Sequence, residues 1–372
     1  MSRAEGAGKS RTRVVVKIGS ASISRPDGGL DRDAFEEIVA SLDLALRDDA
    51  EVCVVSSGAI AAGLPALGLT KRPRQIEDLQ VLAAVGQSEL MRAYSETFAA
   101  RGRVVGQVLL TALDFAERRH YLNARNALLR MLELGVIPVI NENDTVATDE
   151  IRFGDNDRLG ALVSQLVGAS LYLILTDTEG VYTADPRLNA SATLIEEVSV
   201  LDEEMIRFAG GAGSELGSGG MLSKLLASRI AAWSGIRCVI AHSRTQDVVR
   251  RALRGESVGT EIKPHSPPLP SRKAWIAFGT FPCGKIEVDE GAQRALKEKG
   301  ASLLPVGVRK VEGSFEAGDA VEIAAEGEVF AKGIVRMDAA SVRQVAGKRT
   351  EELAVGVEEI VHRDDLVVFP SS

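Results

Sequence analysis

Cysteine and histidine are scarce in this sequence, and neither type clusters. The chain of 372 residues contains three cysteines, Cys53, Cys238 and Cys283, which lie far apart, and four histidines. An odd, scattered set of thiols indicates reduced cysteines in a cytoplasmic protein and argues against a disulfide framework. The histidines and cysteines do not have the spacing of metal ligands, so the sequence predicts no zinc site.

Long apolar runs are also absent. No run reaches the roughly 18 residues that suggest a membrane span, so we expect a cytoplasmic chain without a membrane segment. The N-terminal MSRAEGAGKSRTR is basic, but no apolar segment of signal-peptide length follows it. The net charge of −8 gives no general attraction to nucleic acid or to anionic lipid. Hydrophobic residues make up 45% and charged residues 26%, which is an ordinary globular mixture.

The N-terminus contains an incomplete P-loop motif. Gly8, Lys9 and Ser10 resemble the end of that phosphate-binding motif, but Arg3 occupies the position of its first glycine. Too few residues precede this motif to form the strand that a P-loop requires. We therefore predict that residues 1–12 form a mobile tail.

A regular alternation of strands and helices runs from residue 13 to about 262. Short β-branched runs alternate with helical stretches such as 31–46, for which Asp31 is a suitable N-cap and Phe35, Ile38, Leu42 and Ala45 form one apolar face. The predicted strands are 13–18, 51–55, 104–110, 136–140, 171–175 and 237–241. Further predicted helices are 123–135, 158–169 and 222–235. Apolar strands between helices favour the α/β class, with a mainly parallel sheet covered on both faces.

A proline-rich stretch then interrupts the pattern. Four of the seven residues in 264–270 are proline, which suits a stiff extended linker. We expect a first domain over 13–263, a linker over 264–273 and a small β-rich domain over 274–372. The runs predicted as strands in this second domain include 274–279, 303–311, 319–325, 329–337 and 366–369, with one helix over 290–300.

Polar and glycine-rich segments follow the predicted strands of the first domain. They are 17–22, 56–63, 141–157 and 176–187. The segment 141–157, NENDTVATDEIRFGDND, is rich in carboxylates and carboxamides. Taken alone, it would suit a solvated turn as well as a functional site. Because ligands bind beyond the carboxyl ends of parallel strands, these segments are predicted to meet at one functional edge.

Two lysines at this edge are candidates for binding phosphate. Lys17 ends the first predicted strand beside Gly19, and Lys224 follows the glycine-rich 217–223 in the first turn of a predicted helix. Ammonium groups and free backbone N–H groups at such positions neutralise a transferring phosphoryl group. Asp157 can orient both lysines as a counter-ion, although it also suits capping of the following helix.

The same edge offers candidates for two substrates. Residues that can hold an acceptor with an amine and a carboxylate are Ser57, Gly58, Asn143, Asp144 and Asn156. Residues that can line a nucleotide pocket are Thr176, Asp177 and Tyr182. Taken singly, each residue is better explained by turn or capping chemistry. Their combination at one sheet edge favours the functional interpretation.

Seven stretches, in this order, resemble the glutamate 5-kinases of the amino-acid kinase superfamily. They are VVVKIGSASIS, VSSGAIAAG, LAAVGQSELM, PVINENDTVAT, FGDNDRLGALVS, LTDTEGVYTADPR and GSGGMLSK. The resemblance covers residues 13 to about 262, and the pair NENDTVAT and FGDND is its specific part. Beyond the linker, DEGAQRALKEKGASLLPVGV is similar to the PUA domain of many bacterial members. Ser218 stands where the family pattern has Thr, and a hydroxyl is retained.

This resemblance implies a three-layer α/β sandwich and transfer of the ATP γ-phosphoryl group to the side-chain carboxylate of L-glutamate, the first step of proline biosynthesis. It implies catalytic roles for Lys17, Lys224 and Asp157, and a glutamate site at the acceptor candidates named above. The implied ATP site comprises Lys17, Gly19, Thr176, Asp177, Tyr182, Ser218, Gly219, Gly220, Met221, Leu222, Ser223 and Lys224. Mg²⁺ would be held mainly by ATP, with Asp155 or Asp157 nearby.

The resemblance also implies partners. Proline is the expected feedback inhibitor, a homo-oligomer (dimer or tetramer) is expected, and a glutamyl-phosphate reductase is a candidate partner. Two alternatives stay open: an RNA-binding or regulatory protein with a degenerate kinase core, and a kinase for N-acetylglutamate or aspartate. Residues 272–372 carry 14 Lys and Arg against 17 Asp and Glu, a net of −3, which does not favour RNA. Candidates for a local basic patch are Lys297, Lys299, Arg309 and Lys310.

Overall fold

The chain is divided into two compact units. The computed structural model describes residues 11–146, 156–201, 205–206, 218–349 and 359–369. The first unit runs to Asp114 and resumes over Tyr121–Pro268. The second contains Phe115–His120 and the chain from Leu269. The division after Pro268 falls inside the proline-rich stretch, and the domain limits drawn from the sequence remain predictions.

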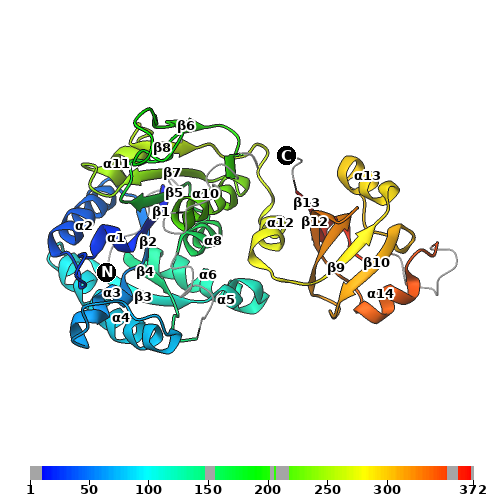
Figure 1. The fold of residues 1–372 in the computed structure, drawn as a ribbon, viewed down its shortest axis with the longest axis horizontal. Coiled ribbons are helices and arrows are strands. Elements are labelled where there is room, and N and C mark those ends of the chain that lie inside the picture. The colour runs from blue at the N-terminus through cyan, green and yellow to red at the C-terminus, as the bar shows by residue number, and fades with distance from the viewer. Residues whose placement is uncertain (1–10, 147–155, 202–204, 207–217, 350–358, 370–372) are drawn as a thin grey trace, which may run out of the picture. The chain divides into compact units, whose positions relative to one another are not determined.

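The first unit is built around a sheet of eight strands in the order β3-β4-β2-β1-β5-β7-β8-β6 (Figure 1). The strands are β1 (Arg13–Ile18), β2 (Glu51–Ser56), β3 (Val104–Leu110), β4 (Val136–Glu142), β5 (Leu171–Thr176), β6 (Glu197–Val198), β7 (Arg237–His242) and β8 (Gly259–Ile262). Neighbouring strands pair in parallel except β7 and β8, which are antiparallel. The predicted α/β class with a mainly parallel sheet is confirmed.

Helices form the two outer layers of this unit (Figure 1). They are α1 (Ser20–Ile23), α2 (Arg32–Arg47), α3 (Ala59–Ala66), α4 (Ile76–Ala99), α5 (Ala112–Ala116), α6 (Arg118–Glu133), α8 (Asp157–Val167), α10 (Ser218–Trp233) and α11 (Val248–Leu253). The end of α5 and the start of α6 fall within Phe115–His120 and belong to the second unit. On one face, Val14, Val16 and Ile18 of β1 share a hydrophobic core with α2, α4 and α11. Because side chains alternate along a strand, Val15 and Lys17 face the other layer, where α8 and α10 pack on the sheet.

Helix α2 shows how local sequence determines an element. Asp31 Oδ1 accepts a hydrogen bond from the Ala34 N–H at 3.1 Å, so the predicted N-cap is confirmed. Phe35, Ile38 and Leu42 are buried in the core, as their helical spacing predicted. In the described part of the chain, no helix is both long enough and apolar enough to span a membrane.

The second unit contains a sheet of five strands in the order β10-β9-β11-β12-β13. The strands are β9 (Pro282–Val288), β10 (Val308–Gly313), β11 (Ala320–Ala325), β12 (Glu328–Ile334) and β13 (Leu366–Val368). The helices are α12 (Ser271–Ala274), a π-helix (Trp275–Gly279), α13 (Glu290–Lys299), α14 (Ala339–Val345) and two short 3-10 turns (Pro305–Gly307 and Arg363–Asp365). The predicted helix over 290–300 is confirmed as α13, whereas the strand predicted over 274–279 is wrong. Periodicity alone cannot separate a strand from a buried helical turn in so short an apolar run.

Two members of the predicted basic patch in this unit are close to carboxylates. Arg309 lies 3.6 Å from an oxygen of Asp289, and Lys310 lies 2.7 Å from Glu312. These carboxylates reduce the net positive charge that the patch presents.

Candidate active site

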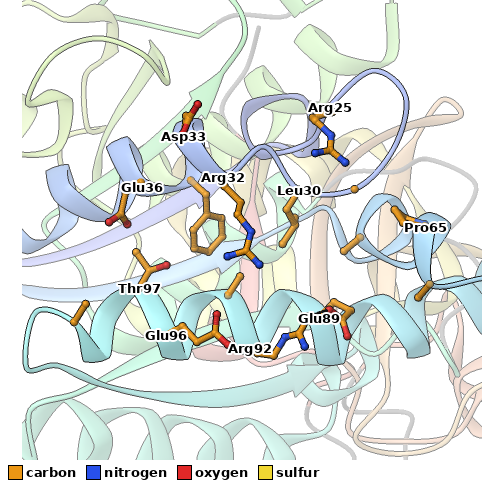
Figure 2. Close-up of a pocket in the computed structure, with 16 residues that line it drawn as sticks. Arg25, Leu30, Arg32, Asp33, Glu36, Pro65, Glu89, Arg92, Glu96 and Thr97 are labelled. Carbon is orange, nitrogen blue, oxygen red and sulfur yellow. Dashed lines mark hydrogen bonds and ion pairs between the residues drawn. The ribbon is translucent and has the colours of Figure 1, made fainter.

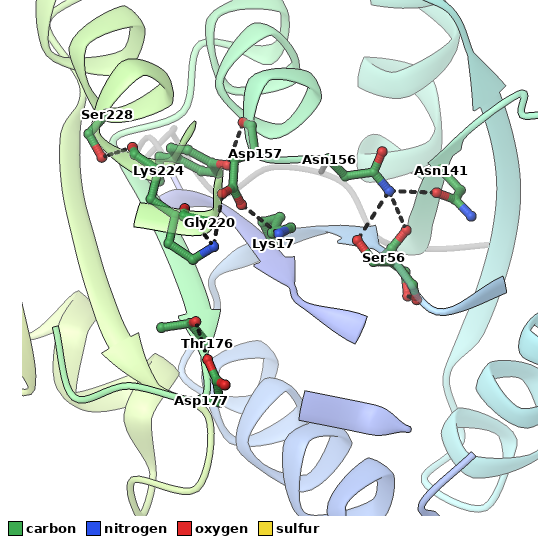
Figure 3. Close-up of polar contacts among 12 residues, drawn as sticks. Lys17, Ser56, Asn141, Asn156, Asp157, Thr176, Asp177, Gly220, Lys224 and Ser228 are labelled. Carbon is green, nitrogen blue, oxygen red and sulfur yellow. Dashed lines mark hydrogen bonds and ion pairs between the residues drawn. The ribbon is translucent and has the colours of Figure 1, made fainter. Parts of the chain in front are cut away.

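Lys17, Asp157 and Lys224 meet at the carboxyl ends of the central strands (Figure 3). The Lys17 Nζ lies 2.5 Å from Asp157 Oδ1, and the Lys224 Nζ lies 3.1 Å from Asp157 Oδ2. The side chain of Asp157 is fully buried, and the exposed fractions of Lys17 and Lys224 are only 3% and 11%. One carboxylate thus holds two ammonium groups, which leaves the cluster with an excess positive charge that can stabilise an anion.

Local geometry explains why these side chains converge. Lys17 lies on the face of β1 that α8 covers, so strand alternation directs its ammonium toward the start of that helix. The Tyr172 hydroxyl of β5 donates to the backbone carbonyl of Asp157 at 2.7 Å. A Cβ at Gly160 would lie 2.4 Å from the same hydroxyl, so glycine is needed for α8 to approach β5 this closely.

Two predictions about helix starts need correction. Helix α8 begins at Asp157, and Asn156 is its N-cap residue without a side-chain capping bond, so the carboxylate of Asp157 serves the lysines. Helix α10 begins at Ser218, not near 222, so the described part of the glycine-rich stretch is helical and Lys224 lies in the second turn. Glycine costs a helix only about 1 kcal/mol per residue, and packing of α10 on α8 and β7 offsets this.

The helical start changes how the glycine-rich segment can bind an anion. The nucleotide candidates Ser218, Gly219, Gly220, Met221, Leu222 and Ser223 all belong to α10. Since the first four N–H groups of a helix have no partner within it, the first turn itself offers donors to a phosphate. The Lys224 Nζ lies 3.3 Å from the Gly220 carbonyl, which places its ammonium beside that turn.

Asn156 joins the ends of β2 and β4 at this sheet edge (Figure 3). Its Nδ2 donates to the Ser56 backbone carbonyl at 2.9 Å and to Asn141 Oδ1 at 2.7 Å, and it lies 3.4 Å from Ser57 Oγ. The predicted acceptor residues Ser57 and Asn156 are therefore in contact. Gly58 follows with φ of +100°, a left-handed conformation that favours glycine, and precedes α3.

Asp144 and Asn143 lie in the turn after β4. Asp144 is half-buried, and this burial raises the pKa of its carboxyl to about 6, although the positive charge of Arg72 acts in the opposite direction. Asn143 Oδ1 accepts from the Thr145 hydroxyl at 2.5 Å, so that side chain supports the turn. Asp155 lies outside the described residues.

The nucleotide candidates at the end of β5 lie beside the end of β1. The Gly19 N–H donates to the Leu175 carbonyl at 3.1 Å, which brings Gly19 next to Thr176. The Thr176 hydroxyl donates to Asp177 Oδ1 at 3.1 Å. Tyr182 is further along the chain, and its hydroxyl donates to Glu179 at 2.7 Å, which raises the pKa of Tyr182.

The donor set at this edge fits Mg²⁺ bound mainly through a nucleotide. Among the residues that the structure describes, no group of three or more His, Cys, Asp or Glu side chains could hold a metal ion. Both carboxylate oxygens of Asp157 face lysines. Mg²⁺ keeps several water ligands and commonly binds through substrate phosphates, so the site does not require a protein cage.

Sequence reasoning missed two polar residues of α4 that support this edge. Gln87 Oε1 accepts from Asn141 Nδ2 at 2.8 Å, and the Tyr94 hydroxyl lies 2.9 Å from Ser56 Oγ. The two residues are seven apart and therefore lie on one face of the helix. That spacing, on a helix face that also carries the apolar Ala83, Leu90 and Phe98, was the available signal.

A separate cavity of about 810 Å³ lies between α2, α3 and α4 (Figure 2). Its charged lining residues are Arg25, Arg32, Asp33, Glu36, Glu89, Arg92 and Glu96. The lining contains both positive and negative groups, and Arg92 is paired with Glu89. The lysine–carboxylate cluster does not contribute to this lining, so the cavity is distinct from the candidate active site.

Comparison with known proteins agrees with this arrangement. The model for "Amino acid kinase family" matches residues 12–242, which is more than half of the chain. The chain belongs to the amino acid kinase family. A second model, for the PUA domain, matches residues 284–357.

Curated members of the amino acid kinase family resemble the chain over almost its whole length. The glutamate 5-kinase of Nitrosospira multiformis is 45% identical over 97% of this chain and 99% of its own. The glutamate 5-kinase of Myxococcus xanthus is 46% identical over 97% of both chains.

A solved structure supports the fold of the amino acid kinase family here. The UMP kinase of Bacillus anthracis has a TM-score of 0.50 with this chain and 16% sequence identity, covering 68% of this chain and 97% of its own. At this identity the likeness concerns the fold alone. The three-layer architecture and the separate β-rich unit match what the sequence predicted.

Proposed function

We propose that this chain is a glutamate 5-kinase, which transfers the γ-phosphoryl group of ATP to the side-chain carboxylate of L-glutamate. The observation that carries the proposal is the buried Asp157 carboxylate with one lysine on each oxygen. Curated relatives that carry this name and match nearly the full chain support the choice of substrate. The product, L-glutamyl 5-phosphate, begins proline biosynthesis.

The chemistry requires positive charge more than a base. The acceptor carboxylate is already ionised at neutral pH, so no proton must be removed before one of its oxygens attacks phosphorus. As that O–P bond forms, the bond between phosphorus and the bridging oxygen of ADP breaks, and ADP leaves with the electron pair. Lys17 and Lys224 neutralise the charge on the transferring group, and Asp157 holds them in position without exchanging a proton.

The proposed acceptor site must bind an ammonium, which needs negative charge or hydrogen-bond acceptors, and two carboxylates, which need hydrogen-bond donors. Asp144 pairs with the ammonium, while the Ser57 hydroxyl and the free N–H groups at the start of α3 bind a carboxylate. Asn143 and Asn156 add dipoles without adding negative charge, which would repel the substrate. The remaining nucleotide candidates, Gly19, Thr176, Asp177 and Tyr182, would contact ATP.

Mg²⁺ and the other partners complete the proposal. Bound to ATP, Mg²⁺ would supply further neutralisation of phosphate charge, with Asp157 or Asp155 nearby. We also propose a cytoplasmic homo-oligomer, a dimer or tetramer, that proline inhibits. Because an acyl phosphate hydrolyses readily, a glutamyl-phosphate reductase is the fitting consumer of the product.

A hydroxamate assay tests the activity directly. The purified protein is incubated with ATP, Mg²⁺, hydroxylamine and one amino acid at a time, and hydroxamate and ADP are measured. We expect both products with L-glutamate and neither with N-acetylglutamate or L-aspartate. The Lys224→Met variant should lose activity by about 100-fold or more, because one charge-stabilising group is removed from the transition state. Lys299→Met, an exposed change in α13, is the matched control.

Asp157→Asn tests whether Asp157 acts as a counter-ion or only as the first residue of α8. A purely helical role predicts nearly normal activity, because Asn keeps the size and polarity of Asp at the start of the helix. The counter-ion role predicts a loss of about 100-fold or more, because one neutral amide cannot hold two ammonium groups. Folded protein that binds ATP but gives no hydroxamate with L-glutamate would contradict the proposal. Hydroxamate with N-acetylglutamate or aspartate instead would indicate a different amino-acid kinase.

A further inference from the structure

Gln87 lies at the outer end of a row of three side-chain amides that reaches the candidate acceptor site. Its Oε1 accepts from Asn141 Nδ2 at 2.8 Å, and Asn141 Oδ1 accepts from Asn156 Nδ2 at 2.7 Å. The row ends at the Ser56 backbone carbonyl, 2.9 Å from Asn156 Nδ2. Figure 3 shows the inner half of this row.

The orientation of every amide in the row is fixed by two backbone groups. The Ser56 carbonyl can only accept, so Asn156 must turn its NH₂ toward it and also toward Asn141. The Glu142 backbone N–H can only donate, and it donates to Asn141 Oδ1 at 2.9 Å. Asn141 therefore presents its NH₂ to Gln87, so Gln87 must accept this hydrogen bond through its side-chain oxygen.

The far side of Gln87 is consistent with this orientation. Its Nε2 is buried and has no hydrogen-bond partner among the described residues. Leaving a buried donor unpaired costs free energy, so the Gln87 amide would turn its NH₂ toward Asn141 if Asn141 offered an acceptor there. The turned form would place two NH₂ groups against one another, and the row excludes it.

The row determines what Asn156 can offer a ligand. Both hydrogens of its amide point at Ser56 and Asn141, so neither is available for a substrate carboxylate. The remaining polar atom is Oδ1, an acceptor, which suits an ammonium. Asn156 is therefore suited to the ammonium of the acceptor and not to its carboxylate.

Helix α4 is held rigidly enough to anchor the row. A Cβ at Gly86 would lie 1.8 Å from the Ala59 carbonyl of α3, and a Cβ at Gly63 would lie 2.3 Å from the Leu82 carbonyl of α4. The two backbones therefore touch immediately beside Gln87. Because α3 follows Ser57 and Gly58 directly, the same contact fixes Gln87 relative to the acceptor candidates.

We infer that Gln87 is a positioning residue that, through its hydrogen bond with Asn141, holds Asn156 in the orientation that presents its carbonyl oxygen to the ammonium of the acceptor. The inference deepens the proposed function and rests on it, since the ammonium belongs to L-glutamate. Gln87 itself does not touch the reacting atoms. Its oxygen stabilises the polarity that the Ser56 carbonyl and the Glu142 N–H set, and this polarity favours an acceptor that carries a free amine.

Three variants at position 87 test this polarity. Gln87→Glu keeps an oxygen for Asn141, Gln87→Met offers neither donor nor acceptor, and Gln87→Lys offers only donors. We expect the KM for L-glutamate to rise about twofold in Gln87→Glu, about fivefold in Gln87→Met and more than about tenfold in Gln87→Lys. The kcat should change less than KM, and the KM for ATP should stay unchanged.

Simple electrostatics predicts the opposite order. L-glutamate is a net anion, so a new lysine should attract it and a new glutamate should repel it. Ser88→Lys is the matched control, because it adds the same charge to α4 at an exposed position next to Gln87, and it should leave the KM unchanged. A lower KM in Gln87→Lys than in Gln87→Glu, or a normal KM in Gln87→Met, overturns the inference.

A second measurement does not depend on activity. Side-chain amide NMR of protein labelled with ¹⁵N-asparagine reports the protons of Asn141 and Asn156. We expect their hydrogen exchange to stay slow in Gln87→Glu and to become fast in Gln87→Lys. Equal exchange in both variants overturns the inference even if L-glutamate proves not to be the substrate. Absence of hydroxamate from the wild-type protein, with the expected exchange pattern, removes the proposed function but leaves the amide row.

Discussion

Asp144 makes acceptor binding sensitive to pH at the scale of one residue. Burial raises its pKa to about 6, so the carboxyl is ionised above that value and neutral below it. An ammonium binds the ionised form, and binding therefore releases a proton at low pH. We predict that the KM for L-glutamate is constant above about pH 7 and rises roughly tenfold per unit below about pH 6. Initial rates between pH 5 and pH 8 measure this.

Substitutions separate this effect from general acid sensitivity. Asp144→Asn should have a raised KM that no longer depends on pH in this range, because the titrating group is gone. Asp33→Asn, at an exposed position of α2, should keep the wild-type profile. A wild-type KM that stays flat down to pH 5 would exclude Asp144 as the partner of the ammonium.

Some features of single residues were accessible from the sequence, and others were not. Lys17 and Asp157 were identified because they stand where strands end or helices begin, positions that local pattern reveals. Their salt bridge depends on the register of β1 against α8, which only the tertiary structure gives. Gln87 lies inside a long helix, so no turn marked it, and its spacing from Tyr94 was the available signal. The catalytic and binding roles of these residues remain predictions.

The contact between α3 and α4 gives a prediction at the scale of elements. Replacing glycine by alanine inside a helix ordinarily stabilises it by about 1 kcal/mol. A Cβ at Gly86, however, would lie 1.8 Å from the Ala59 carbonyl and 2.5 Å from the Gly63 nitrogen, so the helices must separate. We expect Gly86→Ala to reduce the free energy of unfolding by about 2 kcal/mol, measured by denaturant titration.

The same variant should affect acceptor binding selectively. Ser57 and Gly58 lead directly into α3, so its displacement should raise the KM for L-glutamate more than the KM for ATP. Ser88→Ala, two residues away on the exposed side of α4, is the control and should leave stability unchanged or slightly raised. Stabilisation by Gly86→Ala would show that the two helices adjust freely, contrary to the close contact.

Element types were easier to predict than element limits. The continuous apolar runs of β1 and β5 identified these strands almost to the residue, because short apolar runs between helices are typical of buried parallel strands. The start of α10 was placed four residues late, since glycines were interpreted as a loop although packing makes them helical. The apolar run that forms the π-helix was predicted as a strand, because so short a run shows no periodicity that separates a strand from a helix.

At the scale of the whole molecule, the sequence predicted that the chain has two units, but it did not predict every segment that belongs to each unit. Phe115–His120 belongs by its contacts to the second unit. Within that unit, the Trp275 indole N–H donates to the Phe115 carbonyl at 2.7 Å, and the Arg118 guanidinium lies 5.6 Å from the centre of the Trp275 ring. Such contacts join segments about 160 residues apart in sequence, and no local pattern encodes them.

Each unit has a hydrophobic core of its own, so we predict two unfolding transitions. The first core includes Leu42 and the second includes Ile323, and both side chains are fully buried. Leu42→Ala and Ile323→Ala should each lower one transition, by about 2–5 kcal/mol in unfolding free energy. ATP with Mg²⁺ at about 100 times its dissociation constant should raise the first transition alone, by about 2.7 kcal/mol.

The two tryptophans allow each transition to be assigned. Trp233 lies in α10 of the first unit and Trp275 in the second, and the chain contains no other tryptophan. Fluorescence of Trp275→Phe should therefore follow the first unit and respond to ATP, whereas fluorescence of Trp233→Phe should follow the second and ignore it. Because ligand stabilisation acts only on the unit that binds, a shared transition that ATP raises in both variants would mean that the two cores unfold together.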